Sequence, residues 1–172
     1  VVSLSYNKCC IIAGGSIISA DLNTIEFIKY SVINTPEKQN INLTLNKSRN
    51  NFTGQVIDNY FIFAGTNEIP DNTANRDIFD IFYIDNNNEL ISSQVTETSE
   101  FPPYISYLQS SSFILNNNHY ILFFGGIINS NETPMYNNII YLYQVSKNDD
   151  NTLTFTRINI PSLLYYDVIL EC

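Results

Sequence analysis

The 172-residue chain has little of the chemistry on which many enzymes and metal proteins depend, with no tryptophan, one histidine and three cysteines. A single histidine and the lack of a C-x-x-C spacing exclude the usual zinc sites, and three cysteines do not make a disulfide scaffold. Lysine and arginine number only eight against 17 acidic residues, so the net charge of −9 repels phosphate backbones. We therefore expect no cofactor, no catalytic centre and no nucleic-acid partner.

Long apolar runs and helical patterns are also missing. No stretch approaches the ~20 apolar residues needed to cross a bilayer, so we expect no membrane insertion. The opening VVSLSYNKCC has no basic head, which indicates that a signal peptide is absent or already removed. Hydrophobic residues nevertheless make up 44 %, with 12 Tyr and 11 Phe. They occur in short aromatic and β-branched runs divided by Asn, Asp, Gly and Pro, which predicts an all-β chain.

The short runs repeat in groups of four. Second runs that end in small residues are CCIIAGG, YFIFAGT and HYILFFGG. First runs are VVSLSY, FTGQVID and SSSFILN, third runs are IEFIKYSVI, DIFDIFYID and NNIIYLYQV, and fourth runs are INLTLN, ELISSQV and TLTFTRINI. Four strands repeated every 50 to 60 residues or so are typical of β-propeller blades.

The predicted blades cover about residues 1–46, 52–97 and 110–161, and residues 163–172 contain the first strand of a further blade. Three blades do not close a ring, which needs roughly four to eight. The chain is therefore predicted to be one region of a larger propeller. The alternative is an irregular β-sandwich of about a dozen strands.

A pair of small residues that contains glycine marks the end of each second strand, where positive φ or close backbone approach is needed. The predicted structural glycines are Gly14, Gly15, Gly65, Gly125 and Gly126. Asparagine tolerates the left-handed region and favours turns. The expected hairpin turns are Asn7-Lys8, Asp58-Asn59 and the triplet 116–118, and a second triplet, 86–88, is also expected to form a turn.

This arrangement resembles the kelch motif, which places a Gly-Gly doublet after an apolar second strand and a tyrosine followed by an aspartate late in the third. The matching residues are Gly14-Gly15, Gly125-Gly126, the degenerate Ala64-Gly65, Tyr83 with Asp85, Tyr141 or Tyr143, and Arg49 ahead of the second unit. The family's tryptophan is missing, and Leu90 and Phe155 stand in its place. The resemblance implies a partial propeller of about three four-stranded kelch-like blades that serves as a protein-interaction scaffold.

Candidate chemical residues are few. Cys9 and Cys10 are expected to be core residues that point into opposite blade interfaces, although a disulfide from Cys172 to one of them stays open. His119 is expected to be a partly exposed turn residue. Some secreted propellers of related architecture are copper oxidases that use Tyr, His and a Tyr-Cys crosslink. This chain has no matching constellation, so that activity is not carried over.

Acidic and glycosylation motifs complete the inventory. Asp71, Asp77, Asp80 and Asp85 match no calcium-binding spacing and are expected to lie in a solvated polar loop. The sequons at Asn42, Asn46, Asn51 and Asn131 are acceptors for N-linked glycans if the chain passes through a secretory pathway. An Asn-rich chain shows about four by chance, so they give only a weak lean toward an extracellular or cell-surface location, and the cytoplasm stays open.

Three functions remain. The first is a non-catalytic module that binds a protein partner through long polar loops at 67–76 and 127–137. The second is a secreted or cell-surface propeller with glycan-binding or oxidase-like activity, which needs a site that these residues do not supply. The third is a structural subunit of a surface assembly, which the low charge and the Asn- and Tyr-rich composition permit. We favour the first.

Overall fold

The computed structural model describes residues 1–17, 20–30, 35–65, 79–98, 105–128 and 135–160. Their regular structure consists entirely of strands and contains no helix. The segment 163–170, predicted to begin a further blade, lies outside the described residues, as does Cys172.

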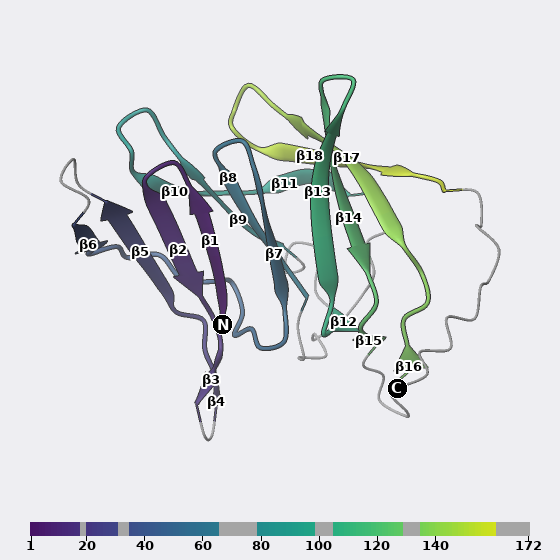
Figure 1. Ribbon diagram of the computed structural model, residues 1–172, viewed down its shortest axis with the longest axis horizontal. Coiled ribbons are helices and arrows are strands. Elements are labelled where there is room, and N and C mark those ends of the chain that lie inside the picture. Colours follow the sequence, from purple (N-terminus) through teal and green to yellow (C-terminus); the bar gives the residue numbers. More distant parts are fainter. Residues whose placement is uncertain (18–19, 31–34, 66–78, 99–104, 129–134, 161–172) are drawn as a thin grey trace.

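Three sheets follow one another along the chain, and each contains four antiparallel strands in sequence order, with a fifth, parallel strand at the edge of the third (Figure 1). Blade 1 consists of β1 (Val2–Tyr6), β2 (Cys9–Ala13), β5 (Ile25–Tyr30) and β6 (Pro36–Gln39). Blade 2 consists of β7 (Thr53–Ile57), β8 (Tyr60–Ala64), β9 (Phe79–Ile84) and β10 (Leu90–Ser93). Blade 3 consists of β13 (Gln109–Leu115), β14 (Asn118–Phe124), β17 (Tyr141–Lys147) and β18 (Leu153–Ile158). The predicted fold class is confirmed, because the chain is all-β and its sheets stack like propeller blades that do not close a ring.

Shorter strands complete the structure. A two-stranded hairpin is formed by β3 (Ser16–Ile17) and β4 (Ala20–Asp21). A small three-stranded sheet is formed by β12 (Ile105–Ser106), β15 (Ile127–Ile128) and β16 (Met135–Tyr136). The remaining strand, β11 (Val95–Thr98), joins the outer edge of blade 3 parallel to β18.

Strand β8 shows why the blades stack. All five of its residues are buried, so both faces of this strand are covered. Phe61 and Phe63 pack into a core shared with blade 1, whereas Tyr60 and Ile62 pack into a second core shared with blade 3. Burying one such side chain contributes roughly 1.5–3 kcal/mol. Because side chains alternate along a strand, blade 2 stabilises both of its neighbours at once.

The second strands of the outer blades are buried on one face only. In β2, Cys9 and Ile11 are buried toward blade 2 while Cys10 is half-buried on the other face. The prediction that both cysteines are core residues in opposite blade interfaces holds for Cys9 and is wrong for Cys10, which points the other way but is covered by no described blade. Both are free thiols. In β14, Ile121 and Phe123 are buried, whereas Leu122 between them is only half-buried. This one-sided burial follows from having one neighbouring blade instead of two.

The predicted fourth strand of blade 1, INLTLN at 41–46, is wrong. The strand that pairs with β5 is instead β6, which lies earlier in the chain and has the largely polar sequence PEKQ. The 41–46 segment makes only one bridge, from Thr44 to Thr24, yet Leu45 is fully buried between blades 1 and 2. The alternating pattern of the 41–46 segment therefore arises because its apolar side chains are buried along a connecting segment. It does not indicate a strand in the sheet.

The predicted fourth strand of blade 2 is divided between two sheets. Leu90–Ser93 pairs with β9 as expected, but after Gln94 the chain continues as β11 along blade 3. The carbonyl of Gln94 accepts from Leu153 N at 3.0 Å, and Asn148 Nδ2 donates to Thr96 Oγ1 at 3.0 Å. One extended run thus ties the outer edges of two blades together.

The first strands β1, β7 and β13 lie side by side. Gly54 in β7 contacts Leu4 of β1 so closely that a Cβ at this glycine would lie 2.9 Å from the leucine side chain. On the opposite face, Thr53 Oγ1 lies 2.6 Å from Ser110 Oγ of β13 and Gln55 Nε2 donates to the Ser110 carbonyl at 2.9 Å. The inner strands are therefore joined by apolar contact on one side and by polar side chains on the other.

Candidate functional site on the loop face

The two ends of the blades differ. At one end lie the hairpin turns β1–β2, β7–β8 and β13–β14, which we call the turn face. At the other end, second strands lead through glycine toward third strands, and the β3–β4 hairpin and the β12–β15–β16 sheet gather there (Figure 1). We call this end the loop face. The loop predicted at 67–76 lies outside the described residues, as does the middle of the loop at 127–137.

The predicted structural glycines form the base of the loop face. All five have positive φ, from +61° at Gly14 to +109° at Gly15. A Cβ at Gly14 would lie 2.7 Å from the backbone oxygen of Arg49, and one at Gly65 would lie 3.0 Å from the backbone oxygen of Ile105. Arg49 and Ile105 belong to the residues just before β7 and β13, which we call lead-in segments. Glycine is required here because the lead-in segment of the following blade crosses directly over it.

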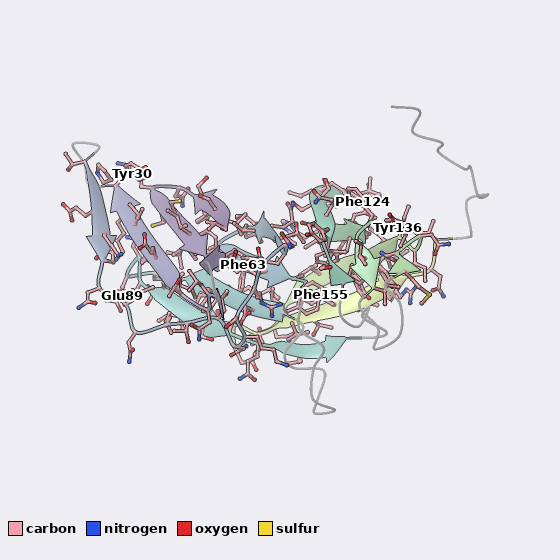
Figure 2. All side chains as sticks on the ribbon, turned by 90° about the horizontal axis from the view of Figure 1, so that it is seen from below. Tyr30, Phe63, Glu89, Phe124, Tyr136 and Phe155 are labelled. Carbon is pink, nitrogen blue, oxygen red and sulfur yellow. The ribbon has the colours of Figure 1, made fainter. Side chains whose placement is uncertain are left out.

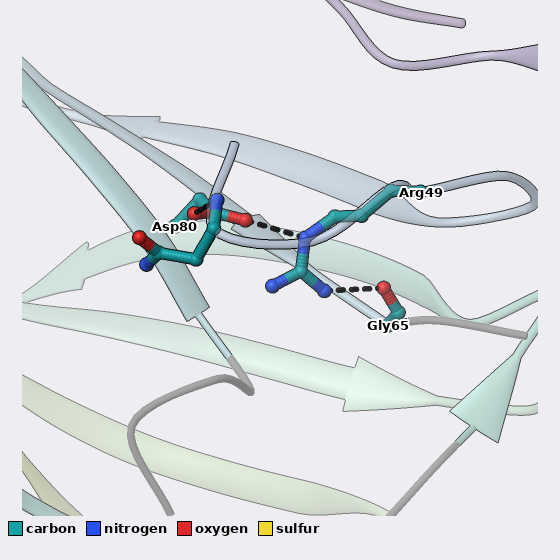
Figure 3. Close-up of polar contacts among 4 residues, drawn as sticks. Arg49, Gly65 and Asp80 are labelled. Atoms are coloured by element: carbon teal, nitrogen blue, oxygen red, sulfur yellow. Dashed lines mark hydrogen bonds and ion pairs between the residues drawn. The ribbon is translucent and has the colours of Figure 1, made fainter. Parts of the chain in front are cut away.

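Arg49 itself forms a buried ion pair. Its side chain is 0 % exposed, and its Nε donates to Asp80 Oδ2 at 2.6 Å while Nη1 donates to the Gly65 carbonyl at 2.6 Å (Figure 3). The second carboxylate oxygen of Asp80 accepts from Asn46 N at 2.7 Å. The backbone oxygen of Arg49 accepts from Gly15 N at 2.8 Å. One cation thus connects the glycine turn of blade 1 to the end of β8 and the start of β9.

The placement of Asp80 corrects the prediction of a solvated acidic loop. Asp80 is the second residue of β9 and only 1 % exposed, because the guanidinium of Arg49 compensates for the loss of hydration. Asp85 does lie in a turn, where its Oδ1 accepts from the backbone N–H groups of Asn87 and Glu89. Asp71 and Asp77 lie outside the described residues. The ion pair gives the loop face a rigid base and carries no reactive group, since both charges are satisfied.

Above this base, the small β12–β15–β16 sheet presents exposed apolar side chains. Tyr136 is 88 % exposed and Met135 56 %, and Figure 2 shows Tyr136 at the rim of blade 3. Tyr107, which directly follows β12, is 55 % exposed. We call these three exposed residues the loop-face patch, in which Met135 and Tyr136 lie on opposite sides of the small sheet because they are consecutive in β16.

The backbone beneath the loop-face patch is held by hydrogen bonds. The buried Asn137 donates from its backbone N to the Gly126 carbonyl at 2.9 Å and from Nδ2 to the Gly125 carbonyl at 2.8 Å. Tyr107 has a φ of +57°, and its N–H donates to the Asn51 carbonyl at 2.7 Å. Exposed side chains on a fixed backbone are what a binding surface requires, because little order remains to be imposed on association. No sequence pattern singled out Tyr107 or Met135, whose exposure depends on how the short strands pair.

The turn face holds a polar cluster between blades 2 and 3. His119 is partly exposed, as predicted, but it is the second residue of β14 and not a turn residue. Its Nε2 lies 3.3 Å from Asp58 Oδ2. The Tyr60 hydroxyl is buried without a hydrogen-bond partner among the described residues. Lys147 Nζ lies 5.5 Å from the centroid of the Tyr60 ring. Burial, reinforced by Tyr83, Asp150 and Asp58, raises the pKa of Tyr60 to about 12. The phenol therefore stays neutral near pH 7 and is not an activated nucleophile.

Other predicted positions do not converge on a site. The side chains of Asn42 and Asn46 are exposed, Asn51 is half-buried and Asn131 lies outside the described residues. Of the residues matched to the kelch motif, Tyr143, Phe155 and Leu90 are buried in the inter-blade cores. Within the described residues, no group of three His, Cys, Asp or Glu side chains is arranged to hold a metal ion. The described residues also include no helix long and apolar enough to cross a membrane.

No family model and no curated protein sequence matches this chain.

Proposed function

We propose that this chain is a non-catalytic, kelch-like β-propeller region that binds a protein partner through its loop face. The observation that carries the proposal is the loop-face patch, in which Tyr107, Met135 and Tyr136 are more than half exposed on a hydrogen-bonded backbone. Aromatic residues and methionine are enriched where proteins bind one another. Tyrosine suits this role because it buries a large ring and can keep its hydroxyl hydrated at the rim.

The surroundings of the patch support a binding role. The Arg49–Asp80 ion pair fixes the glycine turns at the base, so the patch is presented on a rigid scaffold. Interfaces built on fixed elements lose less conformational entropy on association than those built on mobile loops. The net charge of −9 favours a partner whose contacting surface is neutral or basic, because like charges brought together at an interface oppose binding.

The test removes the patch without touching the cores. The variant Met135→Ser/Tyr136→Ser and the wild-type chain are used as baits in the source cells, and captured proteins are compared by quantitative mass spectrometry. Tyr30→Ser is the matched control, because Tyr30 is an exposed tyrosine on the outer face of blade 1. We expect the double variant to lose at least one partner that both the wild type and the control retain. An unchanged set of partners for a folded double variant would refute the loop face as the binding surface.

A further inference from the structure

Left-handed backbone conformations are confined to a narrow set of residue types in this chain. Among the described residues, eight that are not glycine have a positive φ. Seven of them are asparagine or aspartate, whose short polar side chains tolerate this region. These seven are Asn7, Asn51, Asp58, Asn88, Asn116, Asn117 and Asn151. The eighth is Tyr107, with a φ of +57°, and a large aromatic residue in this conformation needs a physical reason.

The same left-handed kink occurs in the lead-in segment of blade 2 with asparagine in its place. Tyr107 lies two residues before β13, and Asn51 lies two residues before β7. Asn51 has a φ of +53°. Each of the two is followed by a buried apolar residue, Leu108 or Phe52. The two lead-in segments therefore follow the same path, and the left-handed residue is part of that path.

Hydrogen bonds and burial hold Tyr107 in this conformation. Its N–H donates to the carbonyl of Asn51 at 2.7 Å, so the two kinks are joined directly. Its neighbours Ser106 and Leu108 are 3 % and 1 % exposed. Ser106 is also paired with Ile127 in the ladder between β12 and β15. The backbone at Tyr107 cannot leave the left-handed region without breaking these contacts.

The tyrosine side chain is not what this path requires. In the left-handed region the Cβ of most residues crowds the following carbonyl oxygen, and asparagine offsets part of that cost with local hydrogen bonds. Asn51 shows that a residue suited to the conformation can form the kink. The ring of Tyr107 does not fill the core either, because the side chain is 55 % exposed. Strain of this kind is typical of functional sites, where it fixes the position of a side chain.

The surface around Tyr107 is uncharged in the described structure. The segments that form the small sheet and its flanks, 105–108, 125–128 and 135–140, contain no acidic or basic residue. The charged residue nearest to Asn51 along the chain is Arg49, whose charge is buried against Asp80. A charged partner surface would lose hydration here without gaining an opposite charge. The surface therefore fits a partner whose contacting region is also uncharged.

We propose that Tyr107 is the anchor residue of the loop-face interface and that its ring inserts into an uncharged pocket on a folded protein partner. The inference rests on the function proposed above. A side chain on a fixed backbone loses little conformational entropy on binding, and tyrosine is among the residues that dominate binding energy when they fill a pocket. The pocket must offer an apolar wall for the ring and a hydrogen-bond partner for the phenol.

The first test measures stability. Tyr107→Asn gives the lead-in segment of blade 3 the residue that the lead-in segment of blade 2 already has. Its melting temperature should rise by roughly 2–4 °C, because asparagine relieves part of the strain. Tyr136→Asn is the matched control, since Tyr136 is an exposed tyrosine without a positive φ, and it should show no rise. A melting temperature of Tyr107→Asn that stays the same or falls would overturn the proposal, because the ring would then stabilise the chain itself.

The second test measures binding to a purified probe. The probe is the protein that the wild-type chain captures and the variant Met135→Ser/Tyr136→Ser does not. Tyr107→Asn should weaken its affinity at least about 30-fold, although this variant is folded and more stable than the wild type. Tyr107→Phe keeps the ring and should weaken the affinity less. Tyr30→Ser is the control and should bind as the wild type does.

The third test detects contact directly. The photocrosslinking residue p-benzoylphenylalanine at position 107 should crosslink to the probe, and the same residue at position 30 should not. A crosslink from position 107 to a second copy of this chain, or none to the probe, would overturn the proposal.

The failure of this inference can be told apart from the failure of the proposed function. If Met135→Ser/Tyr136→Ser loses a partner that Tyr107→Asn binds as well as the wild type does, Tyr107 is not the anchor and the proposed function stands. If the double variant loses no partner at all, the proposed function fails and the anchor role fails with it.

Discussion

The buried Arg49–Asp80 ion pair makes the stability of the loop face measurable. Replacing Asp80 with leucine would leave the guanidinium of Arg49 fully buried without its carboxylate. Two hydrogen bonds to the carboxylate would be lost, from Arg49 Nε at 2.6 Å and from Asn46 N at 2.7 Å. Hydrogen bonds to charged groups contribute about 1.5–3 kcal/mol each. The two bonds together give about 3–6 kcal/mol, and breaking a buried pair usually costs about 3–5 kcal/mol, so we expect the free energy of unfolding to fall by several kcal/mol.

A double-mutant cycle separates the ion pair from its surroundings. Arg49→Met alone should cost a similar amount, because Asp80 then stays buried with only the Asn46 N–H and the Gly65 carbonyl loses a donor. The double variant Arg49→Met/Asp80→Leu removes both charges. Its loss of unfolding free energy should be smaller than the sum of the two single losses by at least about 2 kcal/mol. Replacing a buried pair with apolar residues of similar volume is often nearly neutral.

The assay is urea unfolding followed by circular dichroism and tyrosine fluorescence, since the chain has no tryptophan. Glu26→Leu is the matched control, because Glu26 also pairs at 2.6 Å, with Lys38, but both side chains are about half exposed or more. An exposed pair contributes at most about 1 kcal/mol. If Asp80→Leu cost no more than Glu26→Leu, or if the cycle showed no coupling, the buried pair would not hold the glycine turns as described.

Three further predictions test separate parts of the structure. Tyr60→Phe should raise the free energy of unfolding by about 1 kcal/mol in urea titrations, because the buried hydroxyl has no partner to lose. The wild-type chain should also lose stability as pH rises from 10 to about 12, because Tyr60 releases its phenolic proton at lower pH in the unfolded form than in the folded form. The variant should lack the part of this pH dependence that comes from Tyr60. Gly14→Ala should lower the melting temperature more than Gly125→Ala, because both share a positive φ but, among the described residues, only Gly14 of the two is crossed by a lead-in segment. Asn148→Ala removes a donor to three threonine hydroxyls, one of them on β11, and should speed amide hydrogen exchange in β11 but not in β8. If β11 were protected from exchange as well in the variant as in the wild type, Asn148 would not have this bridging role.

The repeating strands could be predicted because their signals are local. Runs of aromatic and β-branched residues marked β8 and its counterparts, and glycine marked the points where each lead-in segment crosses. Asparagine and aspartate marked the turns, and Asp58, Asn88 and Asn116 do adopt positive φ. These features were readable because each residue type has a backbone preference that neighbouring blades do not override.

The errors arose where a neighbouring blade decides the outcome. Leu43 and Leu45 alternate like a strand because blade 2 buries them, yet the outer strand is the polar β6, which needs only backbone partners on β5. Asp80 looked solvated because its cation, Arg49, is 31 residues away in the sequence. Tyr107, in the loop-face patch, had no periodic signal at all. Such positions depend on long-range contacts that spacing does not encode.

The central claim is that alternate residues of blade 2 serve two separate interfaces, and proton–proton contacts measured by NMR test it most directly. The Phe79 and Phe155 rings are stacked with centroids 4.8 Å apart in the core between blades 2 and 3, while Phe63 lies 6.0 Å from Phe52 in the core between blades 1 and 2. We expect cross-peaks within each of these two pairs and none between Phe63 and Phe155. A cross-peak that joins Phe63 to Phe155, or the lack of one between Phe79 and Phe155, would contradict the stacked-blade structure.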